Sequence, residues 1–451
     1  MTTRMTEGNP LKLILTFALP LLGGNLFQQL YNIADAAIVG QFLGSKALAS
    51  VGASSSIQFL VLGFCIGISC GFSIPVAQRF GAKDLKEMRS YIFHSYLMTL
   101  FFAVFLTITC VLSCHGILHI LKTPENIYAD AYVYLLILFC GIPFNLLYNL
   151  LAGILRAIGD SKTPFYLLVC STIFNIILDL LFILVFRFGC AGAAAATITA
   201  QGFSGILCLI IIIKKVPVLH LTKEDRVYQN RKIITLTTMG IPMGLQYSIT
   251  AIGSMVMQSA NNGLGSVYVS GFTSGMRIKQ FAMCPFDALA TAVSTFVSQN
   301  YGAARFDRIK KGIKQGITIG VSYGLAIGLV LILFGRPLSM LFIPPSDADV
   351  LNASGKYLRC LGLFYWSLGI LNVCRMCVQG LGFSGRTILS GATEMLARII
   401  VSVFFVPIFG FSAICFADQS AWLSGTLYII PVCIYCVRKL QKQSAGYVQG
   451  S

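Results

Sequence analysis

The chain has 451 residues, of which 56% are hydrophobic and only 11% are charged. A water-soluble protein of this length could not bury so much apolar surface, so the composition predicts an integral membrane protein. The formal net charge of +17 could suit nucleic acid. However, the basic residues cluster in short loops between apolar runs, which is the pattern of the positive-inside rule and argues against a nucleic-acid partner.

Twelve apolar runs are long enough to cross a bilayer, which takes about 20 residues each. They are centred near residues 27, 62, 101, 140, 174, 203, 247, 284, 322, 365, 398 and 425. The first run, residues 11–40, is longer than the core of a signal peptide and is expected to remain as a transmembrane helix. The expected fold class is therefore an all-α integral membrane protein with twelve transmembrane helices.

The charged loops predict the orientation of these spans. An even number of spans leaves both termini on one side of the membrane, and 23 of the 33 Lys and Arg residues fall on that side against 6 on the other. Because basic loops stay in the cytoplasm, both termini are predicted to be cytoplasmic.

The two halves of the chain repeat one another with an offset of 221 to 223 residues. "VAQRFGAK" at 76–83 matches "VSQNYGAA" at 297–304, and "LGS" at 43–45 recurs at 264–266. "ALP" ending at Pro20 answers "GIP" ending at Pro242, and "GDS" at 159–161 answers "GFS" at 382–384. Each half holds six spans, an even number, so both halves cross the membrane in the same sense.

This repeat predicts two six-helix bundles related by a pseudo-two-fold axis along the membrane normal, with a cavity between them. The expected domains are an N-terminal bundle (N-lobe, residues 1–213), a cytoplasmic linker (214–232) and a C-terminal bundle (C-lobe, 233–451).

Two acidic residues lie within apolar runs of the first half. Asp179 belongs to "FNIILDLLFILVF" at 174–186 and follows Asn175 by four residues, so both side chains share one helix face. Asp35 in the first span likewise follows Tyr31 by four residues. A carboxylate near the bilayer centre costs roughly 2.5 to 3.5 kcal/mol, so it is usually retained for a function.

If the N-terminal half folds as a bundle, these faces can converge with Asn149 of the fourth span and Thr197 of the sixth. Two buried carboxylates favour proton binding near neutral pH. Carboxylate, amide and hydroxyl oxygens together equally suit a small cation such as Na⁺. The other interpretation is that the two acids are hydrogen-bonded structural residues without a transport role.

Other polar residues within the spans are candidates for a substrate cavity: Asp287, Glu394, Arg398 and Asp418. Glu394 and Arg398 are four residues apart and are expected to pair with each other. Asp287 and Asp418 have no evident partner in the sequence, and either could contact a cationic substrate or be a satisfied polar residue. Arg277 and Lys279 are expected to reach toward the interface or to counter these acids.

Pro20 removes a backbone hydrogen bond within the first span. A bend at this position could couple Asp35 to the shape of the cavity, or it could be a static kink.

No motif predicts an enzyme. The four histidines form no ligand cluster with acids, no Walker A sequence occurs, and no GxSxG-type elbow is flanked by a suitable base. The CxxC pairs Cys374/Cys377 and Cys433/Cys436 are interpreted as packing residues within spans. We expect no cofactor and no metal beyond a coupling Na⁺. A passive channel is an alternative that countertransport measurements would separate from a carrier.

The motifs in this order resemble the multidrug and toxic compound extrusion (MATE) family over essentially the whole chain. They are the proline early in spans 1 and 7, "Q-x-x-G-A" closing spans 2 and 8, and, in the first half, "QQLYNIADAAIVG", "NLLYNLLAG", "FNIILD" and "GAAAATITAQ". The resemblance is greatest to the DinF-like branch. The NorM-like branch carries a glutamate about eight residues after the span 7 proline, where this chain has Thr250, so no cation site is implied in the second half.

The resemblance implies a first-half ion site made of Tyr31, Asp35, Asn149, Asn175, Asp179 and Thr197. It implies a secondary antiporter of a prokaryotic cell membrane, acting as a monomer, that exports small organic, often cationic or amphipathic, drugs in exchange for H⁺ or Na⁺. The alternative is a flippase of lipid-linked precursors with the same architecture. Such a flippase would need a strongly basic cavity, and few basic residues lie within these spans.

Overall fold

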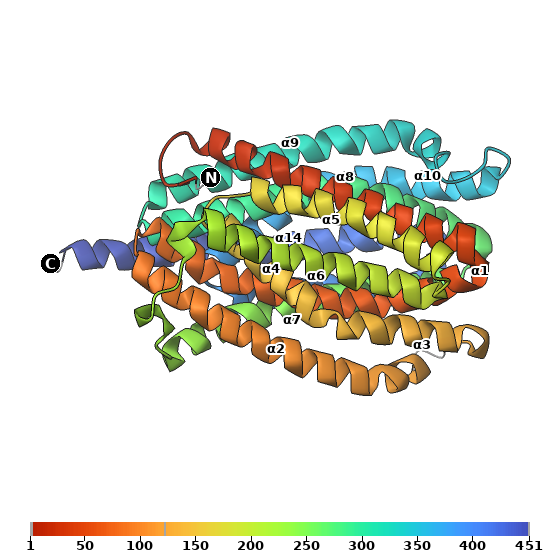
Figure 1. The fold of residues 1–451 in the computed structure, drawn as a ribbon. Helices are drawn as coiled ribbons and strands as arrows, with labels where there is room; N and C mark the ends of the chain where they lie inside the picture. Colours follow the sequence, from red (N-terminus) through yellow and green to blue (C-terminus); the bar gives the residue numbers. More distant parts are fainter. Residues whose placement is uncertain (1–2, 121–122, 450–451) are drawn as a thin grey trace. The chain divides into compact units, whose positions relative to one another are not determined.

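The computed structural model of the protein describes residues 3–120 and 123–449, and every regular element within them is a helix (Figure 1). The first half comprises α1 (Pro10–Gly81), α2 (Leu85–Ile120), α3 (Glu125–Cys140), α4 (Ile142–Ala157), α5 (Lys162–Leu180), the π-helix η1 (Leu181–Val185) and α6 (Gly189–Lys215). Two 3₁₀ turns follow, η2 (Pro217–Leu219) and η3 (Glu224–Arg226). The second half comprises α7 (Asn230–Asn262), α8 (Ser266–Gly302), α9 (Phe306–Ser339), α10 (Ala348–Gly362), α11 (Tyr365–Gly380), α12 (Ser384–Ile400), the π-helix η4 (Val401–Phe405), α13 (Val406–Phe409) and α14 (Phe411–Gln449).

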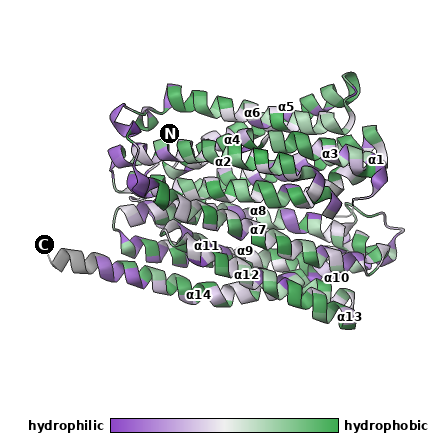
Figure 2. Cartoon of the chain, turned by 90° about the horizontal axis from the view of Figure 1, so that it is seen from below, coloured by the Kyte–Doolittle hydropathy of each residue, from purple (hydrophilic) through white to green (hydrophobic). Residues whose placement is uncertain are grey.

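These helices account for the twelve predicted spans. Among the described residues, 9 helical segments are long and apolar enough to cross a membrane, and the bent pairs α3–α4 (45°) and α10–α11 (54°) raise the number to 11. The remaining span is α7, which has 33 residues and a more polar composition. Figure 2 shows hydrophobic residues along the middle of the helices and hydrophilic residues toward their ends. The prediction of an all-α protein with twelve transmembrane helices is confirmed.

The internal repeat is also visible in the backbone. The π-helices η1 and η4 begin at Leu181 and Val401, and each directly continues a long helix. Left-handed φ angles recur in pairs with nearly the same offset: Gly44 and Gly265, Lys83 and Ala304, Gly159 and Gly382, Gly189 and Gly410. The two halves therefore share local geometry, at three positions where both have glycine and at one where Lys83 corresponds to Ala304.

One of these pairs separates the first two spans. α1 is a continuous element of 72 residues except at Gly44, where φ is 85° and ψ is −179°. An L side chain rarely adopts this conformation, so glycine allows the break that separates the span Pro10–Gly44 from the span Lys46–Gly81.

Contacts divide the chain into two compact units. Unit 1 comprises Met1–Arg4 and Gly23–Gly244, and unit 2 comprises Met5–Leu22 and Leu245–Ser451. Unit 1 thus includes the linker and the first part of α7, whereas the first part of α1 belongs to unit 2. These edges differ from the lobes 1–213 and 233–451, which remain our proposal for how the spans group within the membrane.

Close helix packing explains why the start of α7 belongs to unit 1. A Cβ atom on Gly67 would lie 2.6 Å from the Cα atom of Gly244, so the two backbones touch at this point. Gly240 of α7 likewise packs against the ring of Phe72. Small residues allow such close contact between membrane helices.

The linker is held against α2 by charged groups. Arg89 Nε lies 3.0 Å from Asp225 Oδ2, and Lys232 Nζ lies 3.1 Å from Glu87 Oε2. Burial alone would raise the pKa of Asp225, but hydrogen bonds from Thr222 and the charge of Arg89 outweigh it and lower that pKa below its usual value. Asp225 is therefore ionised at neutral pH and holds the linker in place.

The N-terminal segment is bound by residues that close α8 and begin α9 in unit 2. The Met5 backbone N–H donates to Gln299 Oε1 at 2.8 Å, and Asn300 Nδ2 donates to the Met5 carbonyl oxygen at 3.1 Å. Arg308 donates to the carbonyl oxygens of Met5 and Gly8. The "VSQNYGAA" motif thus supplies side chains that hold the beginning of the chain.

Candidate functional site

The two acids of the first half come together within unit 1. Asp35 of α1 and Asp179 of α5 lie within hydrogen-bonding reach of each other through their carboxyl groups. Asp179 is fully buried and Asp35 is partly buried. The face shared by Asn175 and Asp179 is buried as their spacing predicts.

Aromatic and hydroxyl side chains surround this acid pair. The hydroxyl groups of Tyr31 and Thr197 lie 2.9 Å apart, so one donates to the other and links α1 to α6. Tyr134 of α3 is buried and is an electrostatic neighbour of Tyr31 and of both carboxylates. Sequence reasoning missed Tyr134, because it lies in a tyrosine-rich run whose spacing does not distinguish it.

Within the part of the chain that the structure describes, most polar atoms of the acid pair receive no hydrogen bond. Both oxygens of Asp179, Oδ1 of Asp35, and both polar side-chain atoms of Asn175 are buried and have no hydrogen-bond partner there. An unsatisfied buried polar group costs about 1 to 3 kcal/mol, and a charged one costs more. A proton shared by the carboxyl groups, or a small cation coordinated by these oxygens, would remove this cost.

The helix carrying Asp179 changes its geometry directly after the acid. α5 ends at Leu180 and continues as the π-helix η1. Such π turns are rare and occur frequently at functional sites. A separate apolar cluster that includes Val39, Tyr134 and Ile183 covers this region.

Two sequence candidates are not part of the acid pair's contacts. Asn149 Nδ2 donates to the carbonyl oxygen of Asn145 at 2.9 Å and to its Oδ1 at 3.2 Å. Asn145 Nδ2 in turn approaches Gln201 Oε1 at 3.5 Å. Asn149 therefore belongs to a polar chain between α4 and α6. Pro20 lies within α1, which continues through it as a helix.

In unit 2, unlike unit 1, buried acids are paired with buried bases. Asp418 of α14 accepts from Lys279 Nζ at 2.5 Å, from Arg398 Nε at 3.1 Å and from the Tyr357 hydroxyl at 2.9 Å. Asp418, Lys279 and Arg398 are all at least nine-tenths buried. The expectation that Lys279 counters one of these acids is confirmed. The contacts with Arg398 and Tyr357 could not be predicted from spacing, because they come from other helices.

The predicted pair of Glu394 with Arg398 is wrong. Glu394 instead forms a buried ion pair with Arg375 of α11, and Arg398 turns to Asp418. The spacing of four residues does place both side chains on one face of α12. However, that face packs against helices that carry closer countercharges.

Asp287 of α8 differs from Asp418 and Glu394, because it is neither buried nor, in the part of the chain described, paired with a base. Its side chain is exposed, whereas the neighbouring residues Phe286 and Ala288 are each only 1% exposed. Within the described residues no ion pair or side-chain hydrogen bond engages its carboxylate. Arg375 and Tyr365 are electrostatic neighbours of Asp287, so other protein groups lie beside its exposed carboxylate. Arg277, by contrast, lies on another part of α8 and does not counter these acids.

The two CxxC pairs meet in unit 2, where Cys433 of α14 contacts Cys374 and Cys377 of α11. Among the residues that the structure describes, no group of three or more His, Cys, Asp or Glu side chains has a geometry that could hold a metal ion.

Comparison with known proteins agrees with these observations. The family model described as MatE matches residues 20–181 and 242–404, one stretch in each half. The chain is 36% identical over 378 residues to the probable multidrug resistance protein YpnP of Bacillus subtilis, covering 84% of each chain. It is 29% identical over 338 residues to the probable multidrug resistance protein YoeA of the same organism, covering 73% of each.

Among solved structures, an outward-facing multidrug resistance MATE family transporter of the MOP superfamily matches with a TM-score of 0.91 and 23% identity. The match covers 98% of this chain and 99% of that one, which supports the two-bundle fold. The sequence matches cover both halves of the repeat. The chain therefore belongs to the MatE family, the multidrug and toxic compound extrusion family, and is a multi-pass membrane transporter and not an enzyme.

Proposed function

We propose that the protein is a secondary antiporter that exports small organic compounds, often cationic or amphipathic, in exchange for H⁺ or Na⁺. The proposed ion site is the pair Asp35 and Asp179 with Asn175, Tyr31, Thr197 and Asn149 as its polar surroundings, although Asn149 bonds Asn145 and no described contact joins it to the acids. The family and its relatives named as multidrug resistance proteins support the substrate class. The observation that carries the ion site is the set of buried carboxylate oxygens without protein donors.

Coupling requires that the ion be held with different free energy in the inward-open and outward-open states. A carboxyl pair on two different helices, α1 and α5, meets this requirement because a relative movement of the helices changes the separation of the acids. A proton between the carboxyl groups relieves their repulsion, and its release would require the pair to separate or to gain water. The same argument holds for Na⁺ coordinated by both carboxylates.

Imposed ion gradients test this proposal. Purified protein in proteoliposomes is given a pH gradient or a Na⁺ gradient separately, and export of the fluorescent cation ethidium is followed. We expect Asp35→Asn and Asp179→Asn each to abolish gradient-driven export while the folded protein stays in the membrane. Glu125→Gln, an exposed acid of α3 in the same unit, is the matched control and should export normally. Normal export by either aspartate variant would refute the site.

For the substrate we propose Asp287 as the group that receives the positive charge. A carboxylate in the middle of a long transmembrane helix cannot face lipid without a cost of several kcal/mol. Asp287 is exposed, yet Cys284, Arg375 and Tyr365 are its electrostatic neighbours, so we infer that its recess opens to water. Glu394, Arg398 and Asp418, the other cavity candidates, are engaged in buried ion pairs.

Replacement of Asp287 by Asn should raise the KM for ethidium by about tenfold or more, because a charge-assisted contact contributes about 1.5 to 3 kcal/mol. The export of an uncharged substrate and the maximal rate should change little. Asp307→Asn at the exposed start of α9 is the control. An equal loss for charged and uncharged substrates would assign Asp287 a structural role instead.

The lipid-precursor flippase receives no support from these side chains. Among the described residues, the buried bases of unit 2 are Lys279 and Arg398, which share Asp418, and Arg375, which pairs with Glu394. Two acids thus offset two of the three positive charges, which leaves no strongly basic cavity. We also propose that the transporter functions as a monomer in a prokaryotic cell membrane, with both termini in the cytoplasm.

A further inference from the structure

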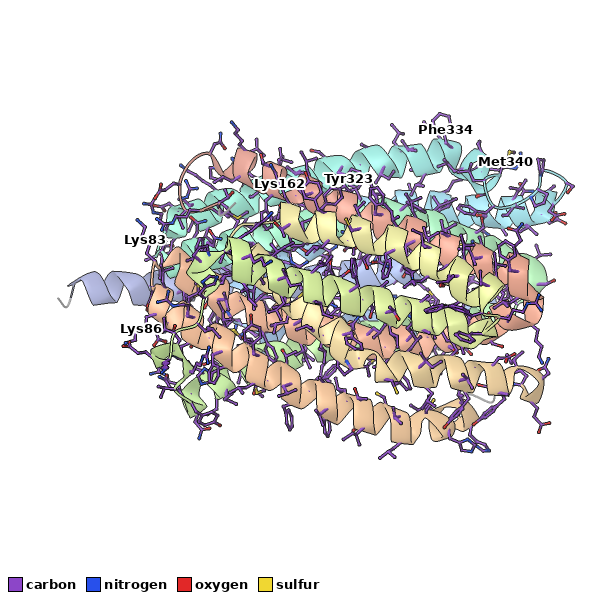
Figure 3. All side chains as sticks on the ribbon, viewed as in Figure 1. Lys83, Lys86, Lys162, Tyr323, Phe334 and Met340 are labelled. Carbon is purple, nitrogen blue, oxygen red and sulfur yellow. The ribbon has the colours of Figure 1, made fainter. Side chains whose placement is uncertain are left out.

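A pocket of about 450 Å³ lies in unit 2 where α8 begins and where α9 connects to α10. Its lining includes hydroxyl, charged and apolar side chains: Ser270, Thr273, Ser274, Arg277, Phe342 and Asp347. Figure 3 labels Phe334 and Met340 on the part of the chain that leads into this connection. The volume is within the range of small-molecule sites. None of the proposed transport residues lines this pocket.

One wall of the pocket is a polar stripe on α8. Ser270, Thr273, Ser274 and Arg277 have the spacing i, i+3, i+4 and i+7, which places them on one helix face. Ser274 is 5% exposed, and its buried hydroxyl has no hydrogen-bond partner among the residues that the structure describes. A buried hydroxyl without a partner at the wall of a pocket indicates that a ligand or water completes its hydrogen bonding.

Two uncommitted charges of opposite sign also line the pocket. The Arg277 guanidinium carbon lies 5.8 Å from the centre of the Phe342 ring, and within the described residues no hydrogen bond or ion pair engages its nitrogens. Asp347 precedes α10, is exposed, and does not cap that helix with its side chain. The two are not within ion-pair distance of each other. A ligand carrying both an anionic and a cationic group would satisfy both.

The position along the helix indicates where such a ligand would come from. α8 has 37 residues, about 55 Å at 1.5 Å per residue, which exceeds the 40 to 45 Å of a bilayer with its headgroups. With α8 centred on the bilayer, Arg277, about 16 Å from the start of the helix, lies a few ångströms inside the boundary between hydrocarbon and headgroups. An arginine at this depth between transmembrane helices is placed to bind the phosphate of a lipid headgroup. Phe342, Ile343 and Pro344 add an apolar wall for the glycerol and upper acyl region.

We propose that this pocket binds a phospholipid whose headgroup carries both a phosphate and a primary ammonium group. The phosphate would accept from Arg277 and the hydroxyls of α8, and the ammonium would donate to Asp347. With the predicted topology the site faces the outer leaflet. This inference is independent of the proposed transport reaction, because it concerns residues that the reaction does not use.

Native mass spectrometry of the full-length protein in detergent, titrated with defined lipids, tests the proposal. The wild-type protein should bind phosphatidylethanolamine more tightly than phosphatidylglycerol with the same acyl chains. Arg277→Gln should weaken the binding of both lipids by about tenfold, the loss of one charge-assisted contact. Asp347→Asn should weaken phosphatidylethanolamine and strengthen phosphatidylglycerol, so that the preference is lost. Arg336→Gln, on α9 and outside the pocket, should behave as the wild type.

Three results would overturn the proposal. One is equal affinity of the wild-type protein for the two lipids. Another is a failure of the arginine comparison: Arg277→Gln binds the lipids as the wild type does, or Arg336→Gln loses as much affinity as Arg277→Gln. Equal losses in the two variants would indicate a general charge effect. The third comes from adding soluble phosphoethanolamine at millimolar concentration. We expect it to leave the lipid bound, because the apolar wall contributes affinity. If soluble phosphoethanolamine displaced the lipid, the pocket would instead be assigned to a soluble zwitterion.

Discussion

Asp418 shows how a buried charge is retained in unit 2. It lies between Lys279 and Arg398 and also accepts from Tyr357, so each carboxylate oxygen has at least one donor. Asp179 in unit 1 is just as buried, but none of the described residues donates a hydrogen bond to it. This difference is why we propose Asp179, and not Asp418, as an ion-exchange residue.

Removing one member of this network should therefore destabilise the protein without changing the coupling ion. We expect Lys279→Met to lower the free energy of unfolding by about 1.5 to 3 kcal/mol, because Asp418 loses one charge-assisted hydrogen bond in a buried site and keeps only those from Arg398 and Tyr357. Thermal unfolding of the detergent-purified protein measures this. Lys356→Met is the matched control, since its ammonium group bonds only the Ser412 hydroxyl at an exposed position. Equal midpoints for the two variants would contradict the structural role.

At the scale of the helix, α9 is held by a row of glycines. Gly312, Gly316, Gly320, Gly324 and Gly328 recur every fourth residue and are all buried. Gly320 packs against Gly369 of α11, and a Cβ atom on Gly324 would lie 2.7 Å from the Cα atom of Trp366. The two helices thus approach until their backbones touch, which is a common way for membrane helices to associate.

Gly324→Ala should therefore destabilise the protein although it adds only a methyl group. The new Cβ would meet backbone atoms, which cannot rotate away, and overpacking of this kind costs about 1 to 3 kcal/mol. Gly385→Ala in α12 is the matched control, because no atom lies within 4 Å of its added Cβ. A lower unfolding temperature for Gly324→Ala, with Gly385→Ala unchanged, is the expected result. A stable Gly324→Ala protein would show that α9 and α11 can move apart.

For the molecule as a whole, the distribution of basic loops predicts the orientation in the membrane. Fusions of a fluorescent protein that folds only in the cytoplasm should be bright at both termini. Fusions of alkaline phosphatase, which is active only outside the cytoplasm, should be active when placed after α9 and inactive after α6. The reverse pattern would contradict the cytoplasmic termini and would also move the headgroup pocket to the inner leaflet.

The two halves of the repeat share their backbone but differ in charge. The break at Gly44 recurs at Gly265, and the π-helix after Asp179 recurs after Arg398. Yet Arg398 and Ser402 occupy the repeat positions of Asn175 and Asp179, so the acid of the first half has no counterpart in the second. We interpret the halves as having separate tasks, ion exchange in one and substrate contact in the other.

Much of the fold was predictable because a bilayer imposes strong rules on sequence. Hydrocarbon excludes unpaired backbone groups, so each apolar run of about 20 residues must become a helix. α7 is a less apolar span than most, but its run centred near residue 247 is still long enough to cross a bilayer. Spacing of four residues also predicted correctly that Asn175 and Asp179 share a buried face.

Contacts between helices were not predictable in the same way. The pairing of Glu394 with Arg375, the contact of Asp418 with Lys279, and the approach of Tyr134 to the acids each join different helices. Spacing along one helix indicates which face a residue occupies, but it does not indicate which neighbour that face meets.

The sequence by itself determined the membrane location, the number of helices, the repeat and the family, because these follow from local hydrophobicity and short motifs. Only the tertiary structure decided which buried acids are neutralised by bases and which are not. Charge pairing within a membrane protein depends on distances of a few ångströms between helices, and those distances exist only after the helices have packed.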